Sequence, residues 1–207
     1  MALILHYHPF SRAANVVWML EEVGCDYTLK YIDLMSGEHK KPELRHLNPM
    51  GKLPTLVDGD AIVTESAAIA LYLADRYALG RLAPKTDAPE RGTYLRWSLY
   101  APSVIEPGCL AKSAKWEFRP SQAGWGTYDE MLDTISTALG KGPWLLGETF
   151  TMADVIFGGT IRYMTMFNML DKRPEYMAYV ERLEARPACK KAQEINNRMI
   201  QERGLNR

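Results

Sequence analysis

Ser11 and Arg12 stand where a short apolar run, residues 3–7, gives way to a helical pattern. A serine at the start of a helix caps it well, because the side-chain oxygen accepts a hydrogen bond from an unpaired backbone N–H. The same N–H groups, at the positive end of the helix dipole, attract an anion, and a hydroxyl beside them can donate to that anion. Ser11 is therefore predicted to cap its helix, to stabilise an anion, or to do both.

Hydrophobic periodicity in the first part of the chain indicates the elements that position Ser11. Alternating residues predict a strand over residues 3–7, and helical spacing predicts a helix from Ala13 to Val23 that Gly24 ends. The further elements expected are a strand at 27–32, a polar helix at about 39–47, two strands at 56–57 and 61–63 around an Asp58-Gly59 turn, and a helix at 65–77. The predicted order is βαβαββα.

A segment rich in proline, glycine and charge, residues 79–88, predicts a linker. Beyond it the strand patterns disappear, and an apolar stripe over residues 128–139 is typical of an amphipathic helix. Pro102 and Pro107 are expected to end or kink the helix that precedes them. The predicted fold is an α/β domain followed by an all-helical domain. The predicted boundaries are 1–78 for the first domain, 79–88 for the linker and 89–207 for the second domain.

The composition argues against several classes of partner. Lys plus Arg and Asp plus Glu each total 25, so no net charge attracts nucleic acid or an anionic membrane. No run approaches the ~18 apolar residues of a spanning helix, and no signal peptide is recognisable, so a cytoplasmic location is expected. The three cysteines are widely spaced and belong to no metal-binding motif, which predicts reduced thiols and no metal site.

The stretch TFTMADV, residues 149–155, predicts the start of another helix. Thr151 can cap the helix while Asp154, three residues later, reaches back to the Thr151 N–H, which is the capping-box pattern. Asp154 is therefore interpreted as a folding residue rather than a catalytic carboxylate.

Four motifs follow one another in a fixed order: a serine at the start of the first helix, NPMGKLP before a strand, TES at the start of a later helix, and LLGETFTMADV in the helical half. This combination resembles the cytosolic glutathione transferase family, and in particular its serine-type bacterial and theta-like members. The resemblance covers nearly the whole chain. It implies a thioredoxin-like N-terminal domain, glutathione as co-substrate without a metal, a small hydrophobic electrophile, and a homodimer that binds neither nucleic acid nor membrane.

The resemblance implies two glutathione-binding segments. Leu53-Pro54 matches the family's cis-proline position, where the N–H and C=O of Leu53 pair with the cysteinyl backbone of glutathione as an added strand residue does. Glu65-Ser66 matches the family's acidic-serine pair. There, unpaired N–H groups and the Ser66 hydroxyl receive the γ-glutamyl carboxylate, and Glu65 takes the ligand's ammonium. Without the family, both segments would be ordinary strand and helix starts.

Two further residues, Lys52 and His39, match positions that hold the glycine carboxylate of glutathione in theta-like members. Lys52 offers a flexible point charge, and His39 offers a hydrogen bond or a charge near neutral pH. A polar segment such as GEHKKPE also suits a solvated surface, so this part of the interpretation depends on the family.

The resemblance gives Ser11 a catalytic task. A free thiol with a pKa near 8.5 is only a few per cent thiolate at neutral pH, and a hydroxyl that donates to sulfur lowers that pKa. Arg12 adds positive potential. The alternatives are that Tyr7 stabilises the thiolate, as in tyrosine-type classes, or that a backbone amide does. No cysteine lies near Ser11, which argues against the omega-like and beta-like cysteine subclasses. The SSCS stretch of maleylacetoacetate isomerases is also absent, which argues against that subclass.

The electrophile pocket is the least constrained part of the prediction. Its expected lining residues are Phe10, Tyr100, Trp116, Phe118 and Met166, although such residues at helical spacing also suit a core. The same thiolate serves peroxide reduction, isomerisation, dehalogenation or ether cleavage, so these activities stay open beside conjugation. A non-catalytic module with the transferase fold is the alternative from a different class.

Overall fold

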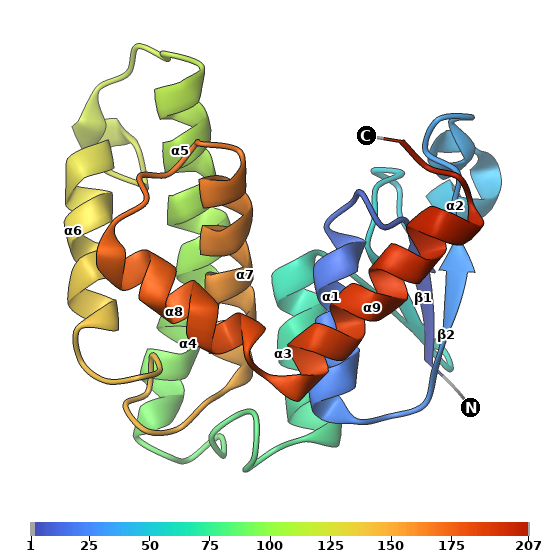
Figure 1. The fold of residues 1–207 in the computed structure, drawn as a ribbon, viewed down its shortest axis with the longest axis horizontal. Helices are drawn as coiled ribbons and strands as arrows, with labels where there is room; N and C mark the ends of the chain where they lie inside the picture. Colours follow the sequence, from blue (N-terminus) through green and yellow to red (C-terminus); the bar gives the residue numbers. More distant parts are fainter. Residues whose placement is uncertain (1–2, 207) are drawn as a thin grey trace. The chain divides into compact units, whose positions relative to one another are not determined.

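The computed structural model describes residues 3–206 of the 207-residue chain. The chain forms two compact units, which are coloured by sequence in Figure 1. The first comprises the residues up to Ala78 together with those from Pro187 onward, and the second is Leu79–Arg186. The second domain predicted from the sequence comprises residues 89–207. The structure instead assigns the last helix to the first unit, because that helix packs against the first helix of the chain.

Within residues 3–206 the first unit holds one four-stranded sheet of order β2-β1-β3-β4. β1 (Leu3–Tyr7) pairs in parallel with β2 (Tyr27–Tyr31). β3 (Thr55–Asp58) runs antiparallel to both β1 and β4 (Ala61–Thr64). β1 is thus an inner strand that is hydrogen-bonded on both sides, so the first residue of the loop that follows it is held in place. The predicted order βαβαββα and the thioredoxin-like fold are confirmed.

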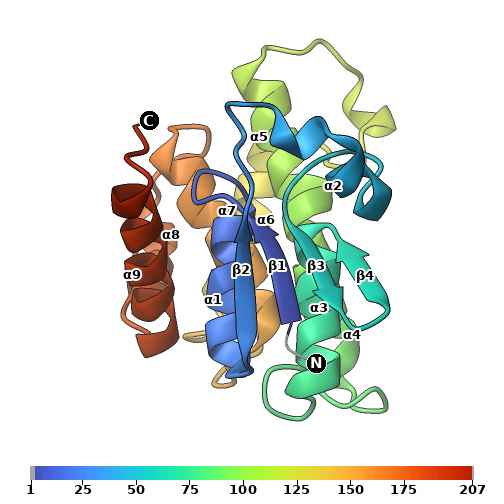
Figure 2. The ribbon, with the colours of Figure 1, turned by 90° about the vertical axis from the view of Figure 1, so that its right-hand side faces the viewer.

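The helices of the first unit are α1 (Ala13–Val23), α2 (Pro42–Leu47), α3 (Ser66–Tyr77) and α9 (Pro187–Glu202). α1 ends where the sequence predicts, because Gly24 adopts a left-handed φ of 76° and its N–H donates to the Leu20 carbonyl at 2.9 Å. α1 packs against α3 and β1, and α9 packs against α1. Figure 2 shows α9 lying outside α1 and running alongside it.

Two local details of the first unit differ from the predicted pattern. The expected polar helix is split into a short 3-10 turn, Glu38–Lys40, and α2, because Pro42 lacks the N–H that a continuous helix needs at that position. The hairpin loop begins one residue later than expected. Asp58 still pairs with Ala61 as the end of β3, and Gly59 takes the positive φ, 60°, that the turn requires.

Asp58 fastens α3 to the sheet. Its carboxylate accepts hydrogen bonds from the hydroxyl of Tyr77 at 2.5 Å and from that of Tyr72 at 2.7 Å, and it pairs with the Arg76 guanidinium at 3.0 Å. The Tyr77 and Tyr72 hydroxyls hold the pKa of Asp58 below its usual range. The last turns of α3 are therefore anchored to the end of β3.

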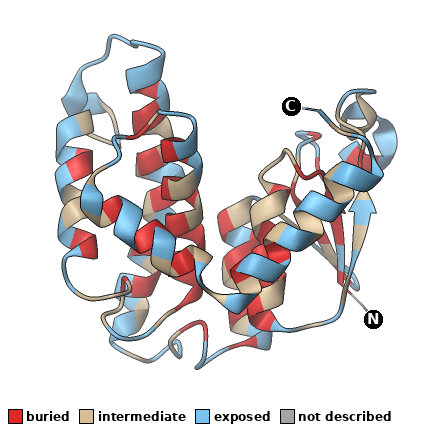
Figure 3. Cartoon of the chain, viewed as in Figure 1, coloured by how far each residue is buried: buried red, intermediate tan, exposed pale blue. Residues whose placement is uncertain are grey.

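The second unit is built from helices, as predicted. They are α4 (Glu90–Tyr100), α5 (Glu106–Ser113), α6 (Tyr128–Leu139), α7 (Met152–Met166) and α8 (Pro174–Glu184), with a short 3-10 turn at Pro120–Gln122. α7 packs against α4, α5 and α8, and Figure 3 shows it buried along most of its length. None of the described helices is long and apolar enough to cross a membrane.

Pro102 and Pro107 interrupt regular α-helical bonding, as expected. Between α4 and α5 lies a π turn, Ala101–Ile105, in which the Glu106 N–H donates to the carbonyl of Ala101, five residues earlier. Because Pro102 has no N–H to offer, the helix widens at this point instead of continuing as an α-helix.

α7 starts with the capping box that TFTMADV predicts, between Thr151 and Asp154. Asp154 is fully buried, and its carboxylate also accepts the Leu145 N–H at 2.9 Å and the Tyr179 hydroxyl at 2.8 Å. The carboxylate therefore joins a loop and two helices of the second unit, which fits its interpretation as a folding residue.

Candidate functional site

Ser11 lies in the turn between β1 and α1. Its hydroxyl oxygen accepts the Ala13 N–H at 3.1 Å, and its proton is donated to the His8 carbonyl at 2.8 Å. Arg12 occupies the N-cap position of α1 without a side-chain cap, so Ser11 provides the side-chain bond to the first turn. In this state the hydroxyl bonds within its own turn. Donation to a ligand requires the proton to turn away from His8, while the bond from Ala13 is retained.

Tyr7, the alternative to Ser11, ends β1 and is fully buried. Its hydroxyl donates to the side-chain oxygen of Asn196 in α9. Burial raises the pKa of Tyr7 above its usual range, so the phenol stays protonated. The Tyr7 hydroxyl is thus part of the contact between β1 and α9.

His8 is a residue of this turn that is not among the predicted site residues. Its ring Nδ1 accepts the Phe10 N–H at 3.1 Å, and its carbonyl accepts both the N–H and the hydroxyl of Ser11. Burial lowers the pKa of His8, which keeps the ring neutral and Nδ1 free to accept. A histidine three residues before the serine is the signal in the sequence that could have identified it.

The segment before β3 contains the predicted cis peptide bond, Leu53-Pro54, which is confirmed. Asn48, buried at the end of α2, scaffolds this segment: its Nδ2 donates to the Lys52 carbonyl at 3.0 Å, and its Oδ1 accepts the Met50 N–H at 3.1 Å. Within residues 3–206 no hydrogen bond is made by the N–H or C=O of Leu53. An extended peptide can pair with these two groups.

The start of α3 is open. Glu65 precedes the helix with φ 65°, a conformation that non-glycine residues rarely adopt, and no described side chain caps the helix. The first helical hydrogen bond runs from the Ile69 N–H to the Glu65 carbonyl at 2.9 Å, so the N–H groups before it lie ahead of the ladder. Ser66 is half-buried there and Glu65 is exposed. Such a terminus suits a carboxylate.

Lys52 and His39 lie on neighbouring segments. Gly51, the residue before Lys52, has φ 56°, and a Cβ built on it would lie 2.7 Å from the His39 carbonyl. Lys40 strengthens this contact by donating to the Met50 carbonyl at 2.9 Å. The Lys52 side chain is exposed, and Nδ1 of His39 is buried without a hydrogen-bond partner among the described residues.

This close approach predicts that Gly51→Ala destabilises the protein more than Gly59→Ala does. Both glycines have φ near 60°, but a Cβ on Gly59 meets nothing within 4 Å. Gly59→Ala should lose about 1 to 2 kcal/mol for the left-handed backbone alone, and Gly51→Ala about 1 to 2 kcal/mol more because the His39 carbonyl must move. Urea unfolding of both variants measures the difference, and equal losses would contradict the close approach.

The predicted electrophile residues are divided between the units. Phe10 belongs to the first, where its ring meets that of His8 edge-on. Tyr100 packs against Trp97 and Phe157 in the aromatic core of the second unit.

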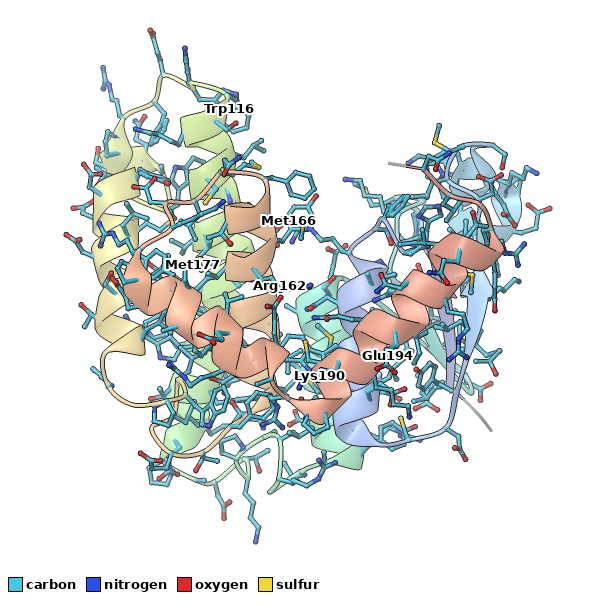
Figure 4. All side chains as sticks on the ribbon, viewed as in Figure 1. Trp116, Arg162, Met166, Met177, Lys190 and Glu194 are labelled. Carbon is cyan, nitrogen blue, oxygen red and sulfur yellow. The ribbon has the colours of Figure 1, made fainter. Side chains whose placement is uncertain are left out.

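The other three predicted pocket residues also lie in the second unit. Trp116, Phe118 and Met166 are 53%, 41% and 43% exposed, and Figure 4 labels Trp116 and Met166 beyond α5 and at the end of α7. A hollow of about 380 Å³ at the end of α6, beside Pro143, Glu175 and Arg182, is lined by none of the predicted residues. The pocket therefore stays a prediction.

Comparison with known proteins gives the family. Residues 1–75 match the model of the glutathione S-transferase N-terminal domain, and residues 117–190 match that of the C-terminal domain. Glutathione S-transferase APIC of Nicotiana tabacum is 31% identical over 94% of this chain and 98% of its own length. The chain belongs to the glutathione S-transferase family. Glutathione S-transferase 1 of Triticum aestivum is also 31% identical, over 89% of this chain and 90% of its own.

A solved structure supports the transferase fold. The glutathione transferase of Phanerochaete chrysosporium in complex with oxidized glutathione has a TM-score of 0.78 and 28% identity, covering 95% of this chain and 97% of its own. In the present transferase, the N-terminal family domain contains Ser11, Leu53-Pro54 and Glu65-Ser66. The three segments proposed to hold glutathione therefore all lie in the family's N-terminal domain.

Two of the three cysteines of this transferase, Cys25 and Cys109, are not activated nucleophiles. Burial raises the pKa of the Cys109 thiol to about 12, and burial also raises that of Cys25. A thiol with a raised pKa is a poor nucleophile at neutral pH. Within residues 3–206 no group of three or more His, Cys, Asp or Glu side chains is placed to hold a metal ion.

Proposed function

We propose that this chain is a glutathione transferase that adds the thiolate of glutathione to small hydrophobic electrophiles. The observation that carries the proposal is the open start of α3. No described side chain caps α3, as is also true of several other helices, but α3 alone among the described α-helices follows a non-glycine residue with a positive φ, Glu65. The γ-glutamyl carboxylate would occupy this place, with the Ser66 hydroxyl donating to it and Glu65 accepting from the ligand's ammonium.

The rest of the tripeptide has matching partners. The free N–H and C=O of Leu53 would pair with the cysteinyl backbone, and Lys52 and His39 would hold the glycine carboxylate. The Phanerochaete chrysosporium relative, solved with oxidized glutathione, supports glutathione as the ligand of this fold. Glutathione acts here as co-substrate, and the proposed reaction uses no metal.

The thiolate would be stabilised by Ser11, as in serine-type members of the family. The Ser11 hydroxyl turns from the His8 carbonyl to the sulfur, and the bond that its oxygen accepts from the Ala13 N–H strengthens it as a donor. The thiol proton leaves to solvent, because a serine hydroxyl is not a base, and the thiolate attacks the electrophilic carbon. On a chlorinated aromatic, the C–S bond forms and the C–Cl bond breaks, so chloride leaves with the electron pair. Arg12 adds positive potential. The engagement of the Tyr7 hydroxyl with Asn196 supports Ser11 over Tyr7.

The remaining features of the proposal rest on the sequence resemblance. The resemblance gives Phe10, Tyr100, Trp116, Phe118 and Met166 as the residues for the electrophile, and the enzyme would work as a homodimer in the cytoplasm. Size-exclusion chromatography with light scattering measures the oligomeric state, and a monomer at micromolar concentration would contradict the dimer.

Calorimetric titration with glutathione tests the proposed site. Wild type should bind glutathione and bind the dipeptide cysteinylglycine far more weakly, since the dipeptide lacks the γ-glutamyl carboxylate. Ser66→Ala should weaken glutathione binding about 10-fold, the effect of one charge-assisted hydrogen bond, and should leave dipeptide binding unchanged. Ser36→Ala is the control, because the Ser36 hydroxyl bonds within its own exposed turn, where it donates to the Asp33 carbonyl. No heat at millimolar glutathione would remove the proposal.

A further inference from the structure

The loop that carries Ser11, residues 8–12, is closed at its base by one residue of α9. β1 ends at Tyr7 before the loop, and α1 begins at Ala13 after it. Asn196 contacts both sides: its Oδ1 accepts the Tyr7 hydroxyl, and its Nδ2 donates to the Ala14 carbonyl at 3.3 Å. A residue almost at the end of the chain thus joins the two elements between which the loop is held.

Asn196 lies on the inner face of α9. Cys189 and Ala192, seven and four residues earlier, are buried on that face, whereas Lys190 and Glu194 lie on the exposed outer face (Figure 4). Asparagine is a weak helix former, and an amide placed against a protein interior is unfavourable unless its hydrogen bonds are made. Both ends of the Asn196 amide are satisfied, and both partners flank the Ser11 loop.

We infer that Asn196 is a positioning residue for Ser11, and that Tyr7 acts through Asn196 rather than on the thiol. This inference rests on the proposed function for its kinetic consequences but not for its structural ones. With the base of the loop fixed, the Ser11 hydroxyl exchanges between only two partners, the His8 carbonyl and the sulfur. With the base of the loop loosened, the Ser11 hydroxyl is no longer held at hydrogen-bonding distance from the sulfur, and a small displacement weakens the bond that it donates to the sulfur.

A second contact between the same helices supplies the control. The Lys191 ammonium lies 2.7 Å from the Glu21 carboxylate, which projects from the last turns of α1, well after the loop. Lys191→Gln loosens the packing of α9 on α1 without touching Tyr7, Ala14 or the loop. The Lys191 side chain is 63% exposed, and the Glu21 carboxylate keeps its hydrogen bond from the Tyr27 hydroxyl, so the variant should fold as wild type does.

The test compares Asn196→Leu with Lys191→Gln. Asn196→Leu should lower kcat about 10-fold and raise the pKa of the bound thiol, with the KM for glutathione changed less than 2-fold, because the α3 and Leu53 contacts are untouched. Lys191→Gln should leave kcat and KM within 2-fold of wild type and the thiol pKa within about 0.3 units, which is the same factor on the pKa scale. Thermal unfolding sets an assay temperature at which both variants are folded. An unchanged kcat and thiol pKa in Asn196→Leu would overturn the inference.

Substitution of Tyr7 distinguishes a positioning role from direct catalysis. Asn196→Leu leaves the Tyr7 hydroxyl in place, so a direct Tyr7 donor would keep the thiol pKa low in that variant. If Tyr7 acts through Asn196, Tyr7→Phe should match the loss of Asn196→Leu, and the double variant should lose no more than either single one. Additive losses would contradict the shared role.

Amide hydrogen exchange tests the positioning without any turnover. The Ala13 N–H donates to the Ser11 oxygen and the Ser11 N–H donates to His8, so both report on the loop. Asn196→Leu should speed their exchange about 10-fold, and Lys191→Gln should not. A wild type that binds no glutathione removes the proposed function, whereas unchanged exchange in Asn196→Leu removes the present inference.

Discussion

Ser11→Ala is expected to lower kcat/KM for a chlorinated aromatic electrophile about 10- to 100-fold and to raise the pKa of enzyme-bound glutathione by about 1 to 2 units. One hydrogen bond to a charged group is worth about 1.5 to 3 kcal/mol, and one pKa unit corresponds to about 1.4 kcal/mol. The thiolate absorbance as a function of pH gives the pKa, and the pH profile of kcat/KM should shift with it. At high pH, where the thiol ionises unaided, most of the rate should return.

Ser36→Ala controls for the loss of a turn hydroxyl. The Ser36 hydroxyl donates to the carbonyl three residues earlier, at 3.3 Å, as the Ser11 hydroxyl does at 2.8 Å, but no predicted site residue lies in its turn. The kcat/KM of the Ser36→Ala variant should stay within 2-fold of wild type. If Ser11→Ala keeps the wild-type thiol pKa, another group stabilises the thiolate. That role would then be assigned to the backbone amides at the start of α1.

Ser11→Ala also removes the acceptor of the Ala13 N–H, so it should lose about 0.5 to 2 kcal/mol of stability. Capping and catalysis thus use different parts of one hydroxyl. The oxygen lone pair serves the helix, and the proton is free to move between the His8 carbonyl and a ligand. Under the proposed function one serine can therefore do both, and the capping bond is the part that the structure shows.

Local patterns predicted the local elements well. Gly24 ends α1, residues 128–139 form α6, and TFTMADV starts α7, because each depends on residues within a few positions of one another. The split of the polar helix at Pro42 differs from the prediction, although proline is a local signal, because this polar segment has no apolar stripe that marks where a helix begins.

Long-range contacts could not be predicted in the same way. The return of α9 to the first unit and the contact of Asn196 with Tyr7 join residues 189 positions apart, and no period in the sequence relates them. The role of Asn48 is intermediate. It lies in the NPMGKLP motif, but only the structure shows its amide bonded to the Lys52 carbonyl. The role of such a residue depends on contacts with partners that are distant in the sequence, so only the three-dimensional structure reveals it.

Asp154→Ala is expected to destabilise the protein by about 3 to 5 kcal/mol, the largest stability loss among the changes considered. The buried carboxylate accepts the N–H of Leu145 at 2.9 Å, the N–H of Thr151 at 2.8 Å and the hydroxyl of Tyr179 at 2.8 Å. Each buried donor left without a partner costs about 1 to 3 kcal/mol, and partial relaxation keeps the total below the sum. Asp154→Asn should lose somewhat less, since one oxygen still accepts while the new NH₂ group faces donors.

The capping box of α6 provides the matched control for Asp154. Glu130 accepts the Thr127 N–H at 2.9 Å in the same arrangement, but it is exposed, so water replaces the lost bonds. Glu130→Ala should therefore lose only about 0.5 to 1 kcal/mol in urea unfolding at pH 7. Equal losses in the two variants would show that burial of the carboxylate is not what makes Asp154 important. A fall of the activity per folded molecule of Asp154→Ala beyond about 2-fold, measured where the variant is folded, would instead assign the carboxylate a part in catalysis.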